Sequence, residues 1–206
     1  MIEHSYKVMV KTLETIQTQK GITYDSFHKM IAELLAEGKT TGENHSEAMI
    51  HYTVMNQKRM LRHDKNLKFS DEVKELFANY DRKVLWVVLT EAWCGDAAHT
   101  VPVMAKLAEL SENIELQILL RDENLELMDE YLTNGGRSIP KLIAFDAETK
   151  EEIGNWGPRP VELQESYMQM RAEEKPFEEI KEVLQKWYNK DKGQTTIQEI
   201  VKSVLK

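Results

Sequence analysis

Apolar positions recur at helical spacing through the first part of the chain. Across residues 24–37 they fall on one face of a 3.6-residue repeat, which predicts an amphipathic helix. A second helix is expected to begin at His45 or Ser46. A shorter one is expected at Ser70, whose hydroxyl suits an N-cap. The pattern therefore predicts an N-terminal helical extension over residues 1–80.

The spacing of apolar residues changes in the middle of the chain. Residues 84–90 form an unbroken, largely β-branched apolar run, as expected of a strand buried on both faces. A second strand is predicted at residues 114–120. Residues 141–145 and 151–156 are predicted to form a hairpin across a short polar connection. With helical segments between the first three strands, this order predicts an α/β domain at residues 81–160, with helices packed on a central sheet.

The final part of the chain returns to helical spacing. Pro160 and Pro176 stand at predicted helix starts, where proline is well tolerated. A short terminal helix is expected to begin at Thr195 or Thr196. We expect residues 161–206 to form C-terminal helices that pack on the central domain.

Composition and charge narrow the range of functions. The chain has 206 residues, 41% of them hydrophobic and 30% charged, and a formal net charge of −8. An acidic balance disfavours broad nucleic-acid binding. No apolar run approaches the roughly 20 residues of a membrane span, and the start of the sequence has no signal-peptide pattern. A single cysteine cannot form an internal disulfide. We therefore expect a cytoplasmic protein without nucleic-acid or membrane partners.

The candidate chemistry lies at residues 91–99, which read Glu-Ala-Trp-Cys-Gly-Asp-Ala-Ala-His. Cys94, the only cysteine, stands at the start of a predicted helix, where unpaired backbone N–H groups favour a thiolate. Asp96 opposes that effect by like-charge repulsion, and His99 offsets Asp96 if its ring reaches back toward the sulfur. From sequence, the direction of the net pKa shift stays open.

Several motifs and their spacing resemble the thioredoxin family. Residues 93–96, Trp-Cys-Gly-Asp, stand where thioredoxins carry Trp-Cys-Gly-Pro. Pro102 has the spacing of the kink proline in the thioredoxin active-site helix. Residues 138–140, Ser-Ile-Pro, match the turn whose cis proline faces the thiol. The whole chain is similar to bacterial thioredoxin-family proteins that have helices before the core and a Trp-Gly-Pro-Arg-Pro stretch, here residues 156–160. The resemblance implies a thioredoxin fold, a central mixed β-sheet with flanking helices, between N-terminal and C-terminal helical extensions.

The resemblance also implies a site around Cys94 as the catalytic residue. The residues implied to form the turns of that site are Trp93, Gly95, Asp96, Ala97, Ile139 and Pro140. The candidate ligand-binding residues flank these turns and are Arg137, Trp156 and Arg159. The two arginines suit the carboxylates of a tripeptide-like thiol, and structural ion pairs are the alternative for them. Because no metal-ligand spacing or phosphate loop stands out, we expect no metal and no cofactor.

Two departures from thioredoxins bear on activity. Ala97 occupies the position of the resolving cysteine, and Val88 that of a buried carboxylate that moves the second thiol's proton. Dithiol reductase activity is therefore not expected.

Three hypotheses remain for the function. In the first, Cys94 forms mixed disulfides with a protein or a low-molecular-weight thiol, as a monothiol protein of cell redox homeostasis. The second is a redox-inactive binding or adaptor module with a groove beside Pro140. The third is a thiol transferase with a pocket between the core and the N-terminal helices. The identity of the partner and the oligomeric state stay open.

Overall fold

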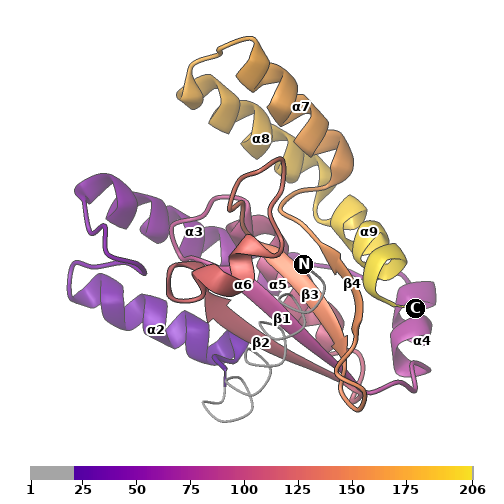
Figure 1. Ribbon diagram of the computed structural model, residues 1–206. Helices are drawn as coiled ribbons and strands as arrows, with labels where there is room; N and C mark the ends of the chain where they lie inside the picture. The colour runs from indigo at the N-terminus through magenta and orange to yellow at the C-terminus, as the bar shows by residue number, and fades with distance from the viewer. Residues whose placement is uncertain (1–20, 206) are drawn as a thin grey trace.

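The centre of the protein is a mixed four-stranded sheet in the order β2–β1–β3–β4 (Figure 1). This computed structural model describes residues 21–205. Strand β1 (Val84–Thr90) pairs in parallel with β2 (Ile114–Leu120) and antiparallel with β3 (Lys141–Asp146). Strand β4 (Glu152–Trp156) pairs antiparallel with β3 and completes the hairpin. The predicted α/β sheet is confirmed.

Strand β1 positions the candidate site. All seven of its residues are buried, as the unbroken apolar run predicted. In the β1–β3 register Leu89, near the end of β1, lies opposite Lys141, the first residue of β3. The loop after β1 and the turn before β3 therefore lie at the same end of the two neighbouring strands. This pairing brings residues 93–96 and 138–140 together although they are far apart in the sequence.

Helices precede, connect and follow the strands along the described chain. From residue 21 to residue 205 they are α2 (Tyr24–Ala36), α3 (Glu47–Asn66), α4 (Asp71–Ala78), α5 (Ala97–Ala108), the 3-10 helix η1 (Arg121–Glu123), α6 (Leu125–Asp129), α7 (Val161–Ala172), α8 (Phe177–Asp191) and α9 (Gln194–Val204).

The ends of the helices follow the local sequence. The Ser70 hydroxyl accepts a hydrogen bond from the Val73 N–H and caps α4, as predicted. One predicted start is wrong, because α9 begins at Gln194 and not at Thr195 or Thr196. The carboxylate of Asp191, at the end of α8, accepts the backbone N–H of Thr195 instead.

The described part of the N-terminal extension packs on the sheet. Phe27 and Ile31 of α2 and Met60 of α3 lie in the same buried cluster as the strands. This burial of their apolar faces is what amphipathic helices next to a core require. The part of the predicted extension that covers residues 1–20 lies outside the described residues.

The C-terminal segment divides into two parts. Helix α9 packs on the core through Ile197, Ile200 and Val204. Helices α7 and α8 form a hairpin that projects beyond the end of the sheet (Figure 1), and they bury a separate apolar cluster between them. At the candidate site, Gln185 and Tyr188 of α8 contact His99 and Asp96.

The N-terminal helices should contribute strongly to stability. Phe27 is only 1% exposed, so Phe27→Ala is expected to lower the free energy of unfolding by about 3–5 kcal/mol. Leu61→Ala is the control, because Leu61 is 55% exposed on α3 and should cost less than about 0.5 kcal/mol. Urea denaturation followed by circular dichroism measures both. Equal, small losses for the two variants would contradict the packing of α2 on the core.

Candidate functional site

Cys94 lies in the loop between β1 and α5, facing the turn before β3. Its side chain is 8% exposed. The thiol Sγ donates a hydrogen bond to the carbonyl oxygen of Ile139 at 3.3 Å. The Ile139–Pro140 peptide bond is cis. The two turns that the sequence singled out, residues 93–96 and 138–140, thus form one site around the sulfur.

The environment of Cys94 disfavours a thiolate. Burial raises the pKa of the thiol to about 12, and the nearby Asp96 carboxylate adds to this. The backbone N–H groups of Ala97 and Asp96 and the Arg159 guanidinium oppose the shift only in part. His99 supplies no positive charge, because burial lowers its pKa to about 3 and leaves the imidazole neutral. At neutral pH, Cys94 is therefore a protonated thiol.

Asp96 is held by a buried ion pair and a tyrosine hydroxyl. Arg159 Nε donates to Asp96 Oδ1 at 2.9 Å, and the second guanidinium nitrogen lies 2.6 Å from Oδ2. The Tyr188 hydroxyl donates to the same Oδ1 at 2.9 Å. Burial raises the pKa of Asp96, whereas Arg159 and Tyr188 favour its charged form. Arg159, a candidate ligand-binding residue, is therefore engaged in the structural ion pair that was its alternative.

A cavity of about 650 Å³, here called the thiol cavity, opens beside Cys94. It lies between the core loops, the N-terminal half of α3 and the α7–α8 hairpin. Its large apolar and aromatic lining side chains are Met49, Tyr52, Met55, Trp93, Ile139, Tyr167, Phe177 and Leu184. Its charged side chains are the cations Arg59, Arg121, Arg137, Arg159, Lys181 and Lys186 and the carboxylates Asp96, Glu178 and Glu182. All of these cations except Arg59 lie within ion-pair distance of a carboxylate. A mainly apolar hollow with a few convergent charges is typical of a small-molecule site.

The other two candidate ligand-binding residues differ in position. Arg137 lines the thiol cavity, with its guanidinium paired to Asp129 at 2.6 and 2.8 Å. Trp156 does not line the cavity. It is buried in β4, where its indole Nε1 donates to Glu199 of α9 at 2.8 Å. The hydrogen bond from Trp156 connects β4 to α9.

Several residues of the site had no signal in the sequence. Tyr188 and Gln185 reach it from α8, where Gln185 Oε1 lies 3.3 Å from His99 Nε2 and the Tyr188 ring stacks on the His99 ring at 4.4 Å. Asn56 of α3 donates to the carbonyl of Ala92 at 3.0 Å and steadies the loop before Cys94. These contacts join segments that are distant in the chain, so only the fold reveals them.

The described residues contain neither a group suited to a metal ion nor a helix suited to spanning a membrane. From residue 21 to residue 205, no three His, Cys, Asp or Glu side chains are grouped in a way that suits a metal ion. In that same part of the chain, no helix combines the length and apolar character that crossing a membrane requires.

The fold and the site together define a thioredoxin-like protein. A mixed sheet with flanking helices carries a cysteine turn after its first strand and an opposing Ile-Pro turn before its third. A family model described as thioredoxin matches residues 42–175. The match covers well over half of the chain, which therefore belongs to the thioredoxin family.

Similar structures agree on the fold. A crystal structure of a protein of unknown function from Pseudomonas aeruginosa is 19% identical, with a TM-score of 0.50, over 82% of this chain and 96% of that one. An HIV epitope scaffold is 20% identical, with a TM-score of 0.51 and the same coverage. At this level of identity the likeness concerns the fold alone. No curated protein matches the chain significantly.

Proposed function

We propose that this protein is a monothiol thioredoxin-fold protein whose Cys94 forms a mixed disulfide with a low-molecular-weight thiol. The observation that carries the proposal is the position of the sulfur. The only cysteine of the chain lines a cavity of about 650 Å³ that also presents the half-buried guanidinium of Arg59 and several ion-paired cations. A small thiol with carboxylates, such as a tripeptide, suits that combination of apolar wall and cations.

The proposed chemistry is thiol–disulfide interchange. After Cys94 loses its proton to water, its thiolate attacks one sulfur of a small disulfide RSSR. The S–S bond breaks, RS⁻ leaves, and Cys94–S–S–R forms. An external thiolate R′S⁻ then attacks the sulfur of R, giving RSSR′ and the Cys94 thiolate, which regains a proton. Because Ala97 provides no thiol, the second step depends on the external thiolate.

Burial favours a small disulfide over a folded protein as the reactant. Cys94 is 8% exposed, and its sulfur hydrogen-bonds to the backbone on the opposite turn. The α7–α8 hairpin contributes one wall of the cavity. A compact disulfide enters this space more easily than a disulfide within a folded domain, which has to approach the sulfur past the hairpin. Low-molecular-weight thiols are therefore preferred to protein partners in the proposal.

A redox-inactive binding module is the second candidate function. The observation that favours it is the raised pKa of Cys94, about 12, since a protonated thiol is a poor nucleophile. In this alternative the thiol cavity binds a small molecule without a covalent bond.

The thiol transferase hypothesis uses the same cavity, which lies between the core and α3. It differs in that Cys94 attacks a carbon atom of a second substrate.

The pH dependence of Cys94 modification tests the proposal. Since the reactive form is the thiolate and its pKa is about 12, the rate of alkylation by iodoacetamide should rise about 10-fold per pH unit from 7 to 10 without a plateau. Incubation with oxidised glutathione at pH 9 should then add one glutathione to the protein, as measured by intact mass. Cys94→Ser, which has no thiol, is the control and should gain no mass.

One outcome would contradict the role of burial, and another would contradict the proposal itself. A plateau near the free-cysteine pKa of about 8.5 would show that burial does not control the thiol. Normal alkylation at pH 9 without any glutathione adduct would favour the non-covalent binding module.

A further inference from the structure

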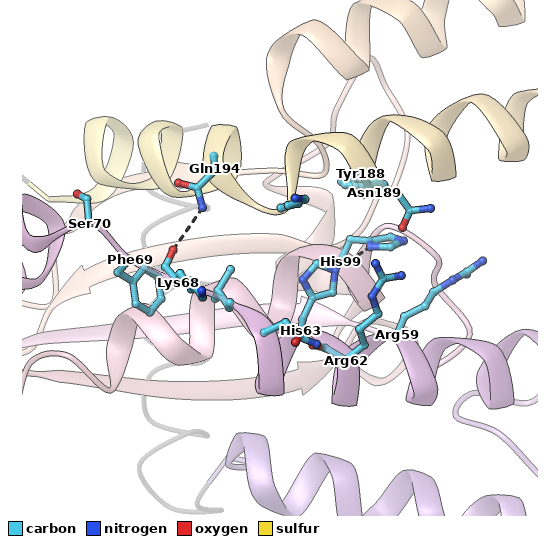
Figure 2. A pocket seen from close by; sticks show the side chains of 13 residues that line it. Arg59, Arg62, His63, Lys68, Phe69, Ser70, His99, Tyr188, Asn189 and Gln194 are labelled. Atoms are coloured by element: carbon cyan, nitrogen blue, oxygen red, sulfur yellow. Dashed lines mark hydrogen bonds between the residues drawn. The ribbon is translucent and has the colours of Figure 1, made fainter.

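A second hollow, of about 680 Å³, is shown in Figure 2 and shares the lining residues Arg59, His99 and Tyr188 with the thiol cavity. We call it the basic pocket. In Figure 2 the side chains of α3 lie on one side of it, and those of α8 and α9 on the other. The loop between α3 and α4 supplies Lys68 and Phe69. Cys94 does not line it, so the proposed thiol chemistry leaves it without a role.

The charge of the basic pocket is opposite to that of the protein. Its lining includes Arg59, Arg62, Lys68 and Lys192, and no aspartate or glutamate from residues 21–205 lines it. The chain as a whole carries a formal charge of −8. Four cations around one hollow repel one another, and an acidic chain offers many carboxylates that would neutralise them. Their concentration here indicates a site that is complementary to an anion.

These cations are available to a ligand. Within the described part of the chain, the ion pairs at 4 Å or less include none of the four. Arg59 donates to the neutral amide oxygen of Asn56 at 2.9 Å and is half-buried. Arg62, Lys68 and Lys192 are exposed at the rim. Together they combine one hydrogen-bonded guanidinium with three exposed charges.

Neutral groups complete the lining. His63 Nε2 lies 3.0 Å from His99 Nδ1, and His99 Nε2 lies 3.3 Å from the amide oxygen of Gln185. We assign the protons from this network: since the amide oxygen is an acceptor, His99 donates through Nε2 and accepts from His63 through Nδ1. The remaining polar and aromatic lining side chains are Asn66, Phe69, Ser70, Tyr188, Asn189 and Gln194.

The geometry points to a binding site in the basic pocket for a small anion that carries a diphosphate-type group. Arginine guanidinium groups match phosphate oxygens in pairs, and lysines add point charges. Four cations with amide and hydroxyl donors suit several negative oxygens better than one carboxylate. The volume of about 680 Å³ exceeds that of a single phosphate and lies in the range of small-molecule sites. Phe69 offers a flat apolar surface to the uncharged part of such a molecule.

Isothermal titration calorimetry with inorganic pyrophosphate tests this inference on the full chain, at constant ionic strength. Wild type should bind one pyrophosphate, whereas Arg62→Gln/Lys192→Gln should bind it about 10-fold more weakly or worse, because two charge-assisted contacts are lost. The matched control is Lys58→Gln/Lys190→Gln, which removes the same charge from the same region of α3 and α8 outside the pocket. The control should bind like wild type, and equal melting temperatures verify that the variants fold.

The same titration with adenosine diphosphate distinguishes the source of the phosphate groups. Tighter binding of the nucleotide than of pyrophosphate supports a ligand with a base on the Phe69 side. Equal binding supports recognition of the diphosphate alone. The inference is overturned if wild type shows no binding at millimolar pyrophosphate, or if the control double variant loses as much affinity as Arg62→Gln/Lys192→Gln.

Discussion

Replacing Asp96 with asparagine should make the thiol more reactive and the protein less stable. The carboxylate of Asp96 is the second largest cause, after burial, of the raised pKa of Cys94, whereas Arg159 lowers that pKa. Asp96→Asn removes the first charge and leaves the second, so the alkylation rate at pH 7.5 should rise about 10-fold or more. Arg159 is then a buried cation without its partner, which should lower the free energy of unfolding by about 3 kcal/mol.

The exposed pair on the rim of the same cavity provides the control. Asp129→Asn also removes a carboxylate from an arginine, Arg137, but the two side chains are 45% and 46% exposed. Its cost should stay below about 1 kcal/mol, and the alkylation rate should not change. Iodoacetamide kinetics and urea denaturation measure both properties at a temperature where each variant is folded. An unchanged alkylation rate in folded Asp96→Asn would show that Asp96 does not control the thiol.

Restoring a second cysteine should create an activity that the wild-type protein lacks. Ala97 is the first residue of α5 and is buried, three positions after Cys94. In Ala97→Cys the new thiol should resolve mixed disulfides from within the same turn, and reduction of insulin by dithiothreitol should rise at least about 10-fold above wild type. Turnover should remain slow, since Val88 offers no carboxylate to move the proton of the new thiol.

Ala97→Ser is the control that distinguishes the effect of a second thiol from the effect of a larger side chain at this position. Serine has nearly the shape of cysteine and cannot resolve a disulfide, so it should show wild-type rates. Titration of free thiols should find none in oxidised Ala97→Cys, because Cys94 and the new cysteine form a disulfide. Strong insulin reduction by the wild-type protein would defeat the monothiol proposal. Two free thiols after oxidation would show that the turn is not built like that of a thioredoxin.

The sequence predicted the elements of the fold better than their association. The apolar run at 84–90 and the hairpin signal at 141–156 depend on local spacing, which survives in a single sequence, and the structure has strands in both places. The separate apolar cluster of α7 and α8 was not predicted. Amphipathic periodicity predicts which face of a helix is buried, but not which other element covers that face.

The site was predicted where it depends on adjacent residues and missed where it depends on tertiary contacts. The turn at 93–96 and Ile139 were predicted from motifs, and they meet at the sulfur of Cys94. The direction of the thiol pKa was not predictable, since it follows from the depth of burial and from Arg159 and Tyr188 around Asp96. Such contacts are set by packing and leave no local pattern in the sequence.

The burial of the single cysteine determines whether two copies of the protein can be linked by a disulfide. A chain with one thiol can cross-link only with another copy, and an S–S bond requires the two Cβ atoms to lie within about 4.5 Å of each other. Cys94 is 8% exposed on the wall of a cavity bounded by α3 and the α7–α8 hairpin, so two folded copies cannot bring their sulfurs together. Oxidising conditions therefore leave the folded protein free of covalent dimers, and aggregates linked through Cys94 report on molecules that have already unfolded.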